Sequence, residues 1–114
     1  MAQVTEQQND GMHRLAVSYH HPADPAAFDA HYTGTHAPLP AQVPGLRSFT
    51  TGHCESLDGS QPAYYMVAEL VFDSAAEMAA GMASPQGAAA VADLPNFAGG
   101  GVTMVHYDDA DRMG

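Results

Sequence analysis

Apolar and polar residues alternate or cluster in four short stretches of the chain, which predicts four β-strands. The alternation is clearest over residues 13–19 and recurs over residues 101–108. Residues 46–55 and 64–72 are rich in β-branched and aromatic residues, and an Asp58-Gly59 turn signal lies between them. We therefore expect a long-looped antiparallel hairpin in the middle of the chain and one strand near each end.

A first helix is expected between the strand at residues 13–19 and the hairpin. Asp24 suits the N-cap and Pro25 the first helical position, where the missing proline N–H has no helical partner to lose. Pro38 and Pro40 disfavour helical geometry in the residues that precede them. The helix should therefore kink or stop near His36.

A second helical segment is expected over residues 75–93. Ser74 and Glu77 form a capping box at its start, and Ser84 followed by Pro85 is a second start signal. This pattern predicts two short helices or one kinked helix. The element order is then strand, helix, strand, strand, helix, strand.

This order is typical of the α+β ferredoxin-like βαββαβ arrangement, a four-stranded antiparallel sheet with the helices on one face. The strand at 64–72 is apolar on both sides, so the second sheet face also needs a cover. We expect a homodimer that forms through the sheet faces. The expected division is a disordered leader at residues 1–12, the folded domain at 13–108 and a polar tail at 109–114.

Composition and charge exclude several classes of function. The 114 residues include 13 acidic residues, three basic residues and a single cysteine, and the formal net charge is −10. Such a charge repels nucleic acid and anionic membranes, so neither is an expected partner. The N-terminus has no basic and apolar signal regions and no long apolar run follows, so a cytoplasmic location is expected.

Candidate chemistry is concentrated in the first helix. Phe28, Tyr32 and His36 stand four residues apart, about 40° from one another around an α-helix, and so share one face. His36 at the proline break is a candidate general acid or base, and Tyr32 is a candidate hydrogen-bond donor to a carbonyl. The alternative roles are structural, with His36 bracing the kink and Tyr32 packing in the core. His31 lies about 140° from His36 on an α-helix and is expected elsewhere.

Further ligand-binding candidates lie outside this face. His53 and His106 interrupt apolar strands, and each can face either the helices, where it would meet His36, or a dimer partner. Glu69 is a carboxylate within an apolar strand and should be paired, with Arg47 as the expected partner, or be protonated, or lie at an open pocket. Leu39 belongs to an expected apolar pocket wall that is rich in methionine and leucine.

No metal site and no cofactor are predicted. A single cysteine cannot supply a thiolate cluster, and the separation of His31 and His36 does not fit a helical two-histidine zinc site. His20, His21 and Asp24 form only a weak cluster without metal-ligand spacing. The glycines at residues 99–101 lead into a strand and lack a phosphate-loop lysine, so nucleotide binding is not expected.

The segment "HYTGTHAPLPAQVPGL", preceded by "HPADPAAF", resembles the signature of the EthD family. The matching residues are Tyr32, His36, Pro38-Leu39 and Pro44-Gly45-Leu46, and Phe72-Asp73 before the second helical segment is similar as well. The resemblance implies a dimeric α+β barrel with a small-molecule pocket between sheet and helices in each protomer. It does not define a reaction.

Together these features favour a cofactor-free isomerase, cyclase or dehydratase that acts on a small hydrophobic carbonyl compound in catabolism or secondary metabolism. An alternative is a non-catalytic carrier, or an accessory protein to a partner oxygenase of the cytochrome P450 type. A third alternative, a cofactorless oxygenase, is implied only by the wider superfamily. Whether the chain is an enzyme at all is left open by the sequence.

Overall fold

The computed structural model describes residues 11–114, so residues 1–10 of the predicted leader lie outside the described part of the chain. The predicted order of strands and helices is confirmed, and the fold is the ferredoxin-like α+β arrangement. The elements are β1 (His13–Tyr19), α2 (Pro25–His31), the turn η1 (Tyr32–His36), the turn η2 (Pro40–Gln42), β2 (Leu46–His53), β3 (Met66–Phe72), α3 (Ala75–Ala83), α4 (Pro85–Asp93), the turn η3 (Leu94–Asn96) and β4 (Val102–Asp108).

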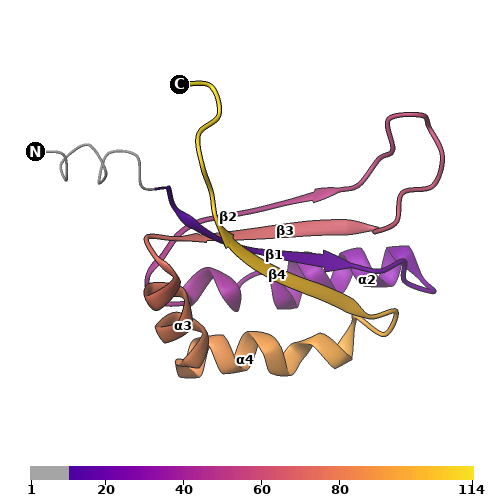
Figure 1. The fold of residues 1–114 in the computed structure, drawn as a ribbon. Helices are drawn as coiled ribbons and strands as arrows, with labels where there is room; N and C mark the ends of the chain where they lie inside the picture. Colours follow the sequence, from indigo (N-terminus) through magenta and orange to yellow (C-terminus); the bar gives the residue numbers. More distant parts are fainter. Residues whose placement is uncertain (1–10) are drawn as a thin grey trace, which may run out of the picture.

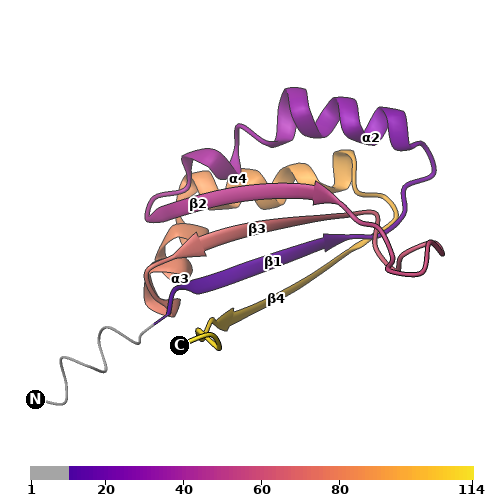
Figure 2. The ribbon, with the colours of Figure 1, turned by 90° about the horizontal axis from the view of Figure 1, so that it is seen from above.

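The four strands form one antiparallel sheet in the order β2-β3-β1-β4. Figure 1 shows α2, α3 and α4 on one side of this sheet, and Figure 2 shows the strands from the other side with no helix in front of them. Every second residue of β1 is buried against the helices, namely His13, Leu15, Val17 and Tyr19. The core therefore lies between sheet and helices, and within residues 11–114 no element covers the other sheet face.

The predicted capping residues start the helices. Asp24 Oδ1 accepts a hydrogen bond from the Ala27 N–H at 3.1 Å, and the hydroxyl of Ser74 does the same for α3. Ser84 ends α3 in an extended conformation, and its hydroxyl then caps α4, which begins at Pro85. The second helical segment therefore consists of two separate helices.

The first helix changes its geometry before it ends. After His31 the backbone widens into a π-helical turn, in which the Ala37 N–H donates to the Tyr32 carbonyl five residues earlier at 2.8 Å. Pro38 and Pro40 have no N–H to donate, so regular helix does not continue through them, and a 3-10 turn begins at Pro40. In this widened turn, side chains five residues apart lie closer to one face than they would on an α-helix.

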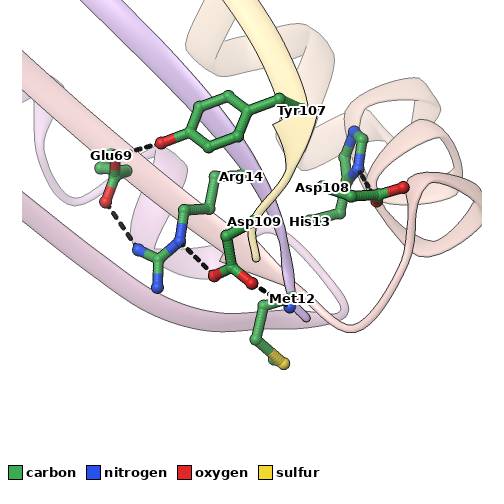
Figure 3. A network of polar contacts seen from close by, with 7 residues as sticks. All are labelled: Met12, His13, Arg14, Glu69, Tyr107, Asp108 and Asp109. Carbon is green, nitrogen blue, oxygen red and sulfur yellow. Dashed lines mark hydrogen bonds and ion pairs between the residues drawn. The ribbon is translucent and has the colours of Figure 1, made fainter. Parts of the chain in front are cut away.

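The open sheet face carries a polar network at one end (Figure 3). Arg14 donates to Glu69 Oε1 and to Asp109 Oδ2, both at 2.7 Å. The Tyr107 hydroxyl donates to Glu69 Oε2 at 3.3 Å, and Asp109 also accepts from the Met12 N–H at 2.9 Å. The first residue of the predicted polar tail is therefore bonded to β1.

The predicted pairing of Glu69 with Arg47 is wrong. Arg47 donates instead to both carboxylate oxygens of Asp73, at 3.1 and 2.7 Å, beside a register shift that interrupts β2. Glu69 lies opposite Ala16 in β1, so Arg14, two residues from Ala16 on the same face, is its diagonal neighbour. Strand register, which the sequence pattern does not specify, decided the partner.

Candidate functional site

The structure brings the three residues of the predicted helix face into one cluster. Phe28, Tyr32 and His36 are all buried, with ring centroids 6.1 Å apart for the first pair and 5.2 Å for the second. Phe97, which follows η3, packs against both ends of this row, 4.6 Å from the His36 ring and 5.1 Å from the Phe28 ring. The row is thus enclosed by aromatic side chains.

The expectation that His31 lies apart from His36 is wrong, because both histidines bond the same carboxylate. His36 Nδ1 is 2.9 Å from Asp93 Oδ2, and His31 Nε2 is 3.0 and 3.1 Å from the two oxygens of Asp93. Residues five apart diverge on an α-helix but come into line across a turn whose hydrogen bond joins residues five apart. The π-helical turn therefore aligns the two histidines.

Asp93 is the central residue that sequence reasoning missed. It ends α4 and is buried, and Asn96 Nδ2 also donates to its Oδ1 at 2.9 Å. The buried positions of α4 are Gly87, Ala90 and Asp93, each three residues after the last. That spacing is visible in the sequence and is a signal for a carboxylate that points into the core.

Burial and hydrogen bonding act in opposite directions on the ionisable groups of this cluster. Burial disfavours the Asp93 carboxylate, but hydrogen bonds from Asn96, His31 and His36 outweigh it and lower the pKa of Asp93 to about 2. For His36, burial outweighs the attraction of Asp93 and lowers the imidazole pKa. Burial raises the pKa of Tyr32 to about 12. At neutral pH these shifts favour a charged Asp93, a neutral His36 and a protonated Tyr32.

A small cavity of about 30 Å³ lies between the sheet and the helices, next to His36 and Tyr32. The enclosed part of this space can hold a water molecule, and the cavity opens to the surface beside the exposed Val91 and Met104. Tyr19 and Tyr32 both lie at its wall, with ring centroids 5.6 Å apart and planes at 80°. The remaining lining residues are all apolar, namely Leu15, Val17, Pro40, Phe49, Ala68, Leu70, Met82, Ala90, Val91, Leu94 and Met104.

The two strand histidines lie on the helix-facing side of the sheet, but each has a partner other than His36. His53 Nε2 is 3.0 Å from Asp29 Oδ1 of α2, and its side chain is exposed. His106 Nδ1 is 2.9 Å from Nε2 of His13, which is buried in β1. Neither belongs to the lining of the cavity.

The other ligand-binding candidates are dispersed. Glu69 lies on the open sheet face in the Arg14 network, and Leu39 borders a shallow hollow beside α4. Phe28 faces a second, larger groove on the outer side of the cluster. The structure therefore brings His36 and Tyr32 to the cavity and places Phe28, Leu39, His53, Glu69 and His106 around it or away from it.

Two kinds of feature are absent from the part of the chain that the structure describes. No group of three or more His, Cys, Asp or Glu side chains there has an arrangement that would hold a metal ion. Within residues 11–114, no helix combines the length and the apolar character needed to cross a membrane.

Fold and site together define a small ferredoxin-like α+β protein with a histidine–carboxylate cluster beside an apolar cavity. The model of the EthD domain matches residues 20–101. An uncharacterized 11.0 kDa protein of Rhodococcus erythropolis, described by its place in the thcB-thcC intergenic region, is 51% identical over 98 residues, which are 86% of this chain and 95% of the relative. The chain belongs to the EthD family.

Solved structures agree with this assignment. An EthD family protein from Bacillus halodurans C-125 superposes with a TM-score of 0.81 at 31% identity, over 86% of this chain and 98% of that one. A dimeric ferredoxin-like protein of unknown function from Thermobifida fusca has a TM-score of 0.64 at 18% identity, over 90% and 93% of the two chains. The second likeness shows the fold alone.

Proposed function

We propose that the chain is a cofactor-free acid–base catalyst that moves a proton within a small hydrophobic carbonyl compound. One observation carries the proposal: Asp93 engages Nδ1 of the buried His36, and this leaves Nε2 as the ring nitrogen for a molecule in the adjoining cavity. A carboxylate that fixes the tautomer and orientation of a histidine is a recurring device for general bases. Isomerisation, cyclisation and dehydration all need such a step.

The proton transfer follows from the protonation states. The neutral His36 takes a proton from the carbon next to the carbonyl through Nε2, and the C–H electron pair forms an enolate. Tyr32, whose raised pKa keeps the phenol protonated, donates a hydrogen bond to the enolate oxygen. The imidazolium, stabilised by Asp93, then returns the proton to another atom of the same molecule.

Exchange of α-hydrogens tests this step without knowledge of the natural substrate. Cyclopentanone in D2O exchanges its α-hydrogens when a base removes them, and proton NMR follows the loss of signal. We expect the full chain to accelerate the exchange and His36→Gln to lower the acceleration by a factor on the order of 100. Tyr32→Phe should reduce the acceleration less. His20 bonds Thr103 outside the cavity, so His20→Gln is the matched histidine control. Equal rates in the wild-type and His36→Gln proteins would exclude His36 as the base.

A carrier for a hydrophobic intermediate is the second candidate. The apolar lining of the cavity supports this second candidate. For a carrier, His36→Gln should change ligand affinity and leave turnover of a partner enzyme unaltered. Native mass spectrometry of freshly purified protein would detect a bound apolar molecule.

We infer that two copies associate through their open sheet faces. Within residues 11–114 no element covers this face, which exposes Val105 and Tyr107, and the similar protein from Thermobifida fusca is described as dimeric. The Arg14 network lies on the same face and would be shielded from water in such a dimer. The same mass spectrum counts the subunits, and a monomer at micromolar concentration would contradict the inference.

A further inference from the structure

His31, the second histidine bonded to Asp93, lies beside a second hollow on the side of the cluster away from the cavity. A groove of about 740 Å³ lies between α2 and the loop that joins η3 to β4. Its volume is in the range of roughly 300–1,000 Å³ that is usual for small-molecule sites. Its lining shares no residue with that of the cavity and comprises His21, Pro22, Ala23, Asp24, Ala27, Phe28, His31, Asn96, Phe97, Gly99 and Gly100.

The loop wall of this groove is held in place by its backbone. Gly101 has a positive φ of 106°, and its carbonyl accepts a hydrogen bond from the His20 N–H at 3.0 Å. A Cβ at Gly100 would stand 2.6 Å from the His21 carbonyl oxygen, so only glycine allows the loop to approach the segment between β1 and α2 this closely. The groove therefore has a defined wall without any side chain at these positions.

His31 lines the groove, and among the described residues only one of its two ring nitrogens has a hydrogen-bond partner. Its Nε2 lies 3.1 and 3.0 Å from the two oxygens of the ionised Asp93, so Nε2 carries a proton and Nδ1 is the ring nitrogen that is left to accept a hydrogen bond from a ligand. The His31 side chain is 26% exposed, whereas that of His36 is only 5% exposed. One carboxylate thus orients two histidines toward two different spaces.

The other residues that line the groove indicate which class of ligand could donate a hydrogen bond to His31 Nδ1. Phe97 stacks on the His31 ring with centroids 5.1 Å apart and planes 15° apart, and Phe28 packs against Phe97. These aromatic neighbours favour a planar ring. Asp24 in the lining and the net charge of −10 disfavour an anion. A neutral aromatic molecule with an O–H donor combines the properties that this surface favours.

We propose that the groove binds small neutral phenols, with the phenolic hydroxyl donating to His31 Nδ1 and the ring lying against Phe28 and Phe97. This site goes beyond the proposed function, because the groove and the cavity have separate linings. Occupancy of the groove does not require that His36 act as a base. His31 is a binding residue of this site, and Asp93 positions it.

Phenol and anisole are a matched pair of probes, because anisole keeps the ring and the oxygen but cannot donate a hydrogen bond. Each is titrated into the uniformly 15N-labelled full chain at pH 8, where free imidazole is neutral, and amide shifts are followed by NMR. We expect saturable shifts for phenol at Gly99, Gly100 and their neighbours, with a Kd on the order of 1 mM for so small a ligand. Anisole should bind about tenfold more weakly, as expected for the loss of one hydrogen bond.

His31→Phe retains a ring against Phe97 and removes Nδ1. The roughly tenfold preference for phenol over anisole should therefore disappear. His36→Gln should retain the preference, which separates a failure of this proposal from a failure of the proposed function. Absence of saturable shifts, shifts centred on the cavity, or equal binding of the two probes to the unmodified chain would each overturn the proposal. These three outcomes are read from titrations of the unmodified chain, so they decide the proposal even if His31→Phe does not fold.

Discussion

Two clusters in this protein contain the same three groups, one aspartate and two histidines, in a different order. In the interior Asp93 lies between His31 and His36 and its side chain is 9% exposed. At the sheet edge Asp108, with a side chain 78% exposed, bonds His13 Nδ1 at 2.6 Å, and His13 Nε2 in turn is 2.9 Å from His106 Nδ1. The difference lies in which member occupies the middle and how much water reaches it.

The order determines which atoms remain available to a ligand. A central carboxylate engages one nitrogen of each histidine, and the second nitrogen of each ring is left for the cavity or the groove. A central histidine has both of its own nitrogens engaged, as the buried His13 does between Asp108 and His106. The interior cluster therefore leaves ring nitrogens for ligands, as both proposals require, and the edge cluster joins β1 to β4.

Removal of each carboxylate in turn should give the largest difference in stability between the two clusters. Asp93→Ala deletes the common acceptor of three side chains in a buried setting, and we expect a loss of about 3–5 kcal/mol in the free energy of unfolding. Asp108→Ala, the matched control, should cost less than about 1 kcal/mol because water can replace the exposed carboxylate. Urea unfolding followed by circular dichroism measures both. Equal losses would show that burial of the carboxylate is unimportant.

The pH dependence of stability should trace mainly to the interior cluster. Asp93 has a folded pKa of about 2 against an ordinary 3.8, so its stabilisation is complete above about pH 4 and is lost as the pH falls toward 2. The difference corresponds to about 2 kcal/mol. His36 acts in the same direction, because a lowered folded pKa means that protonation below about pH 6.5 favours the unfolded chain.

Urea unfolding at a series of pH values checks this. In Asp93→Asn the loss between pH 4 and pH 2 should shrink by about the same 2 kcal/mol, and in His36→Gln the loss that begins below pH 6.5 should become smaller. Asp108→Asn keeps the interior cluster intact and should retain both losses. A pH profile that Asp93→Asn leaves unaltered would contradict this assignment.

The smallest effect is expected for the arginine ion pairs, because water weakens the attraction between exposed charges. Arg14 and Glu69 are about one-third exposed, and a double-mutant cycle between them should give a coupling of less than about 1 kcal/mol. Arg47 and Asp73 are more exposed and should show no measurable coupling. A larger coupling for the second pair would reverse the expected order.

Much of the fold was predictable because local signals and burial agree. The alternation over residues 13–19 predicted β1 with the bounds that it has in the structure, and Asp24-Pro25 predicted the start of α2. The alignment of Tyr32 with His36 was also predictable, because four-residue spacing survives a modest change in helix geometry. The contact of His31 with Asp93 was not predictable in this way, because it depends on a π-helical turn that spacing rules for α-helices do not include.

The sequence by itself determined the order of strands and helices, the family signature and the placement of His36 at a proline break, since propensity, capping and periodicity are local properties. The tertiary structure decided the partners. Packing of α4 against the first helix brought Asp93, 57 residues away from His36 along the chain, into contact with it, and strand register paired Glu69 with Arg14 in place of Arg47. Such contacts depend on the relative positions of whole elements, which no local pattern encodes.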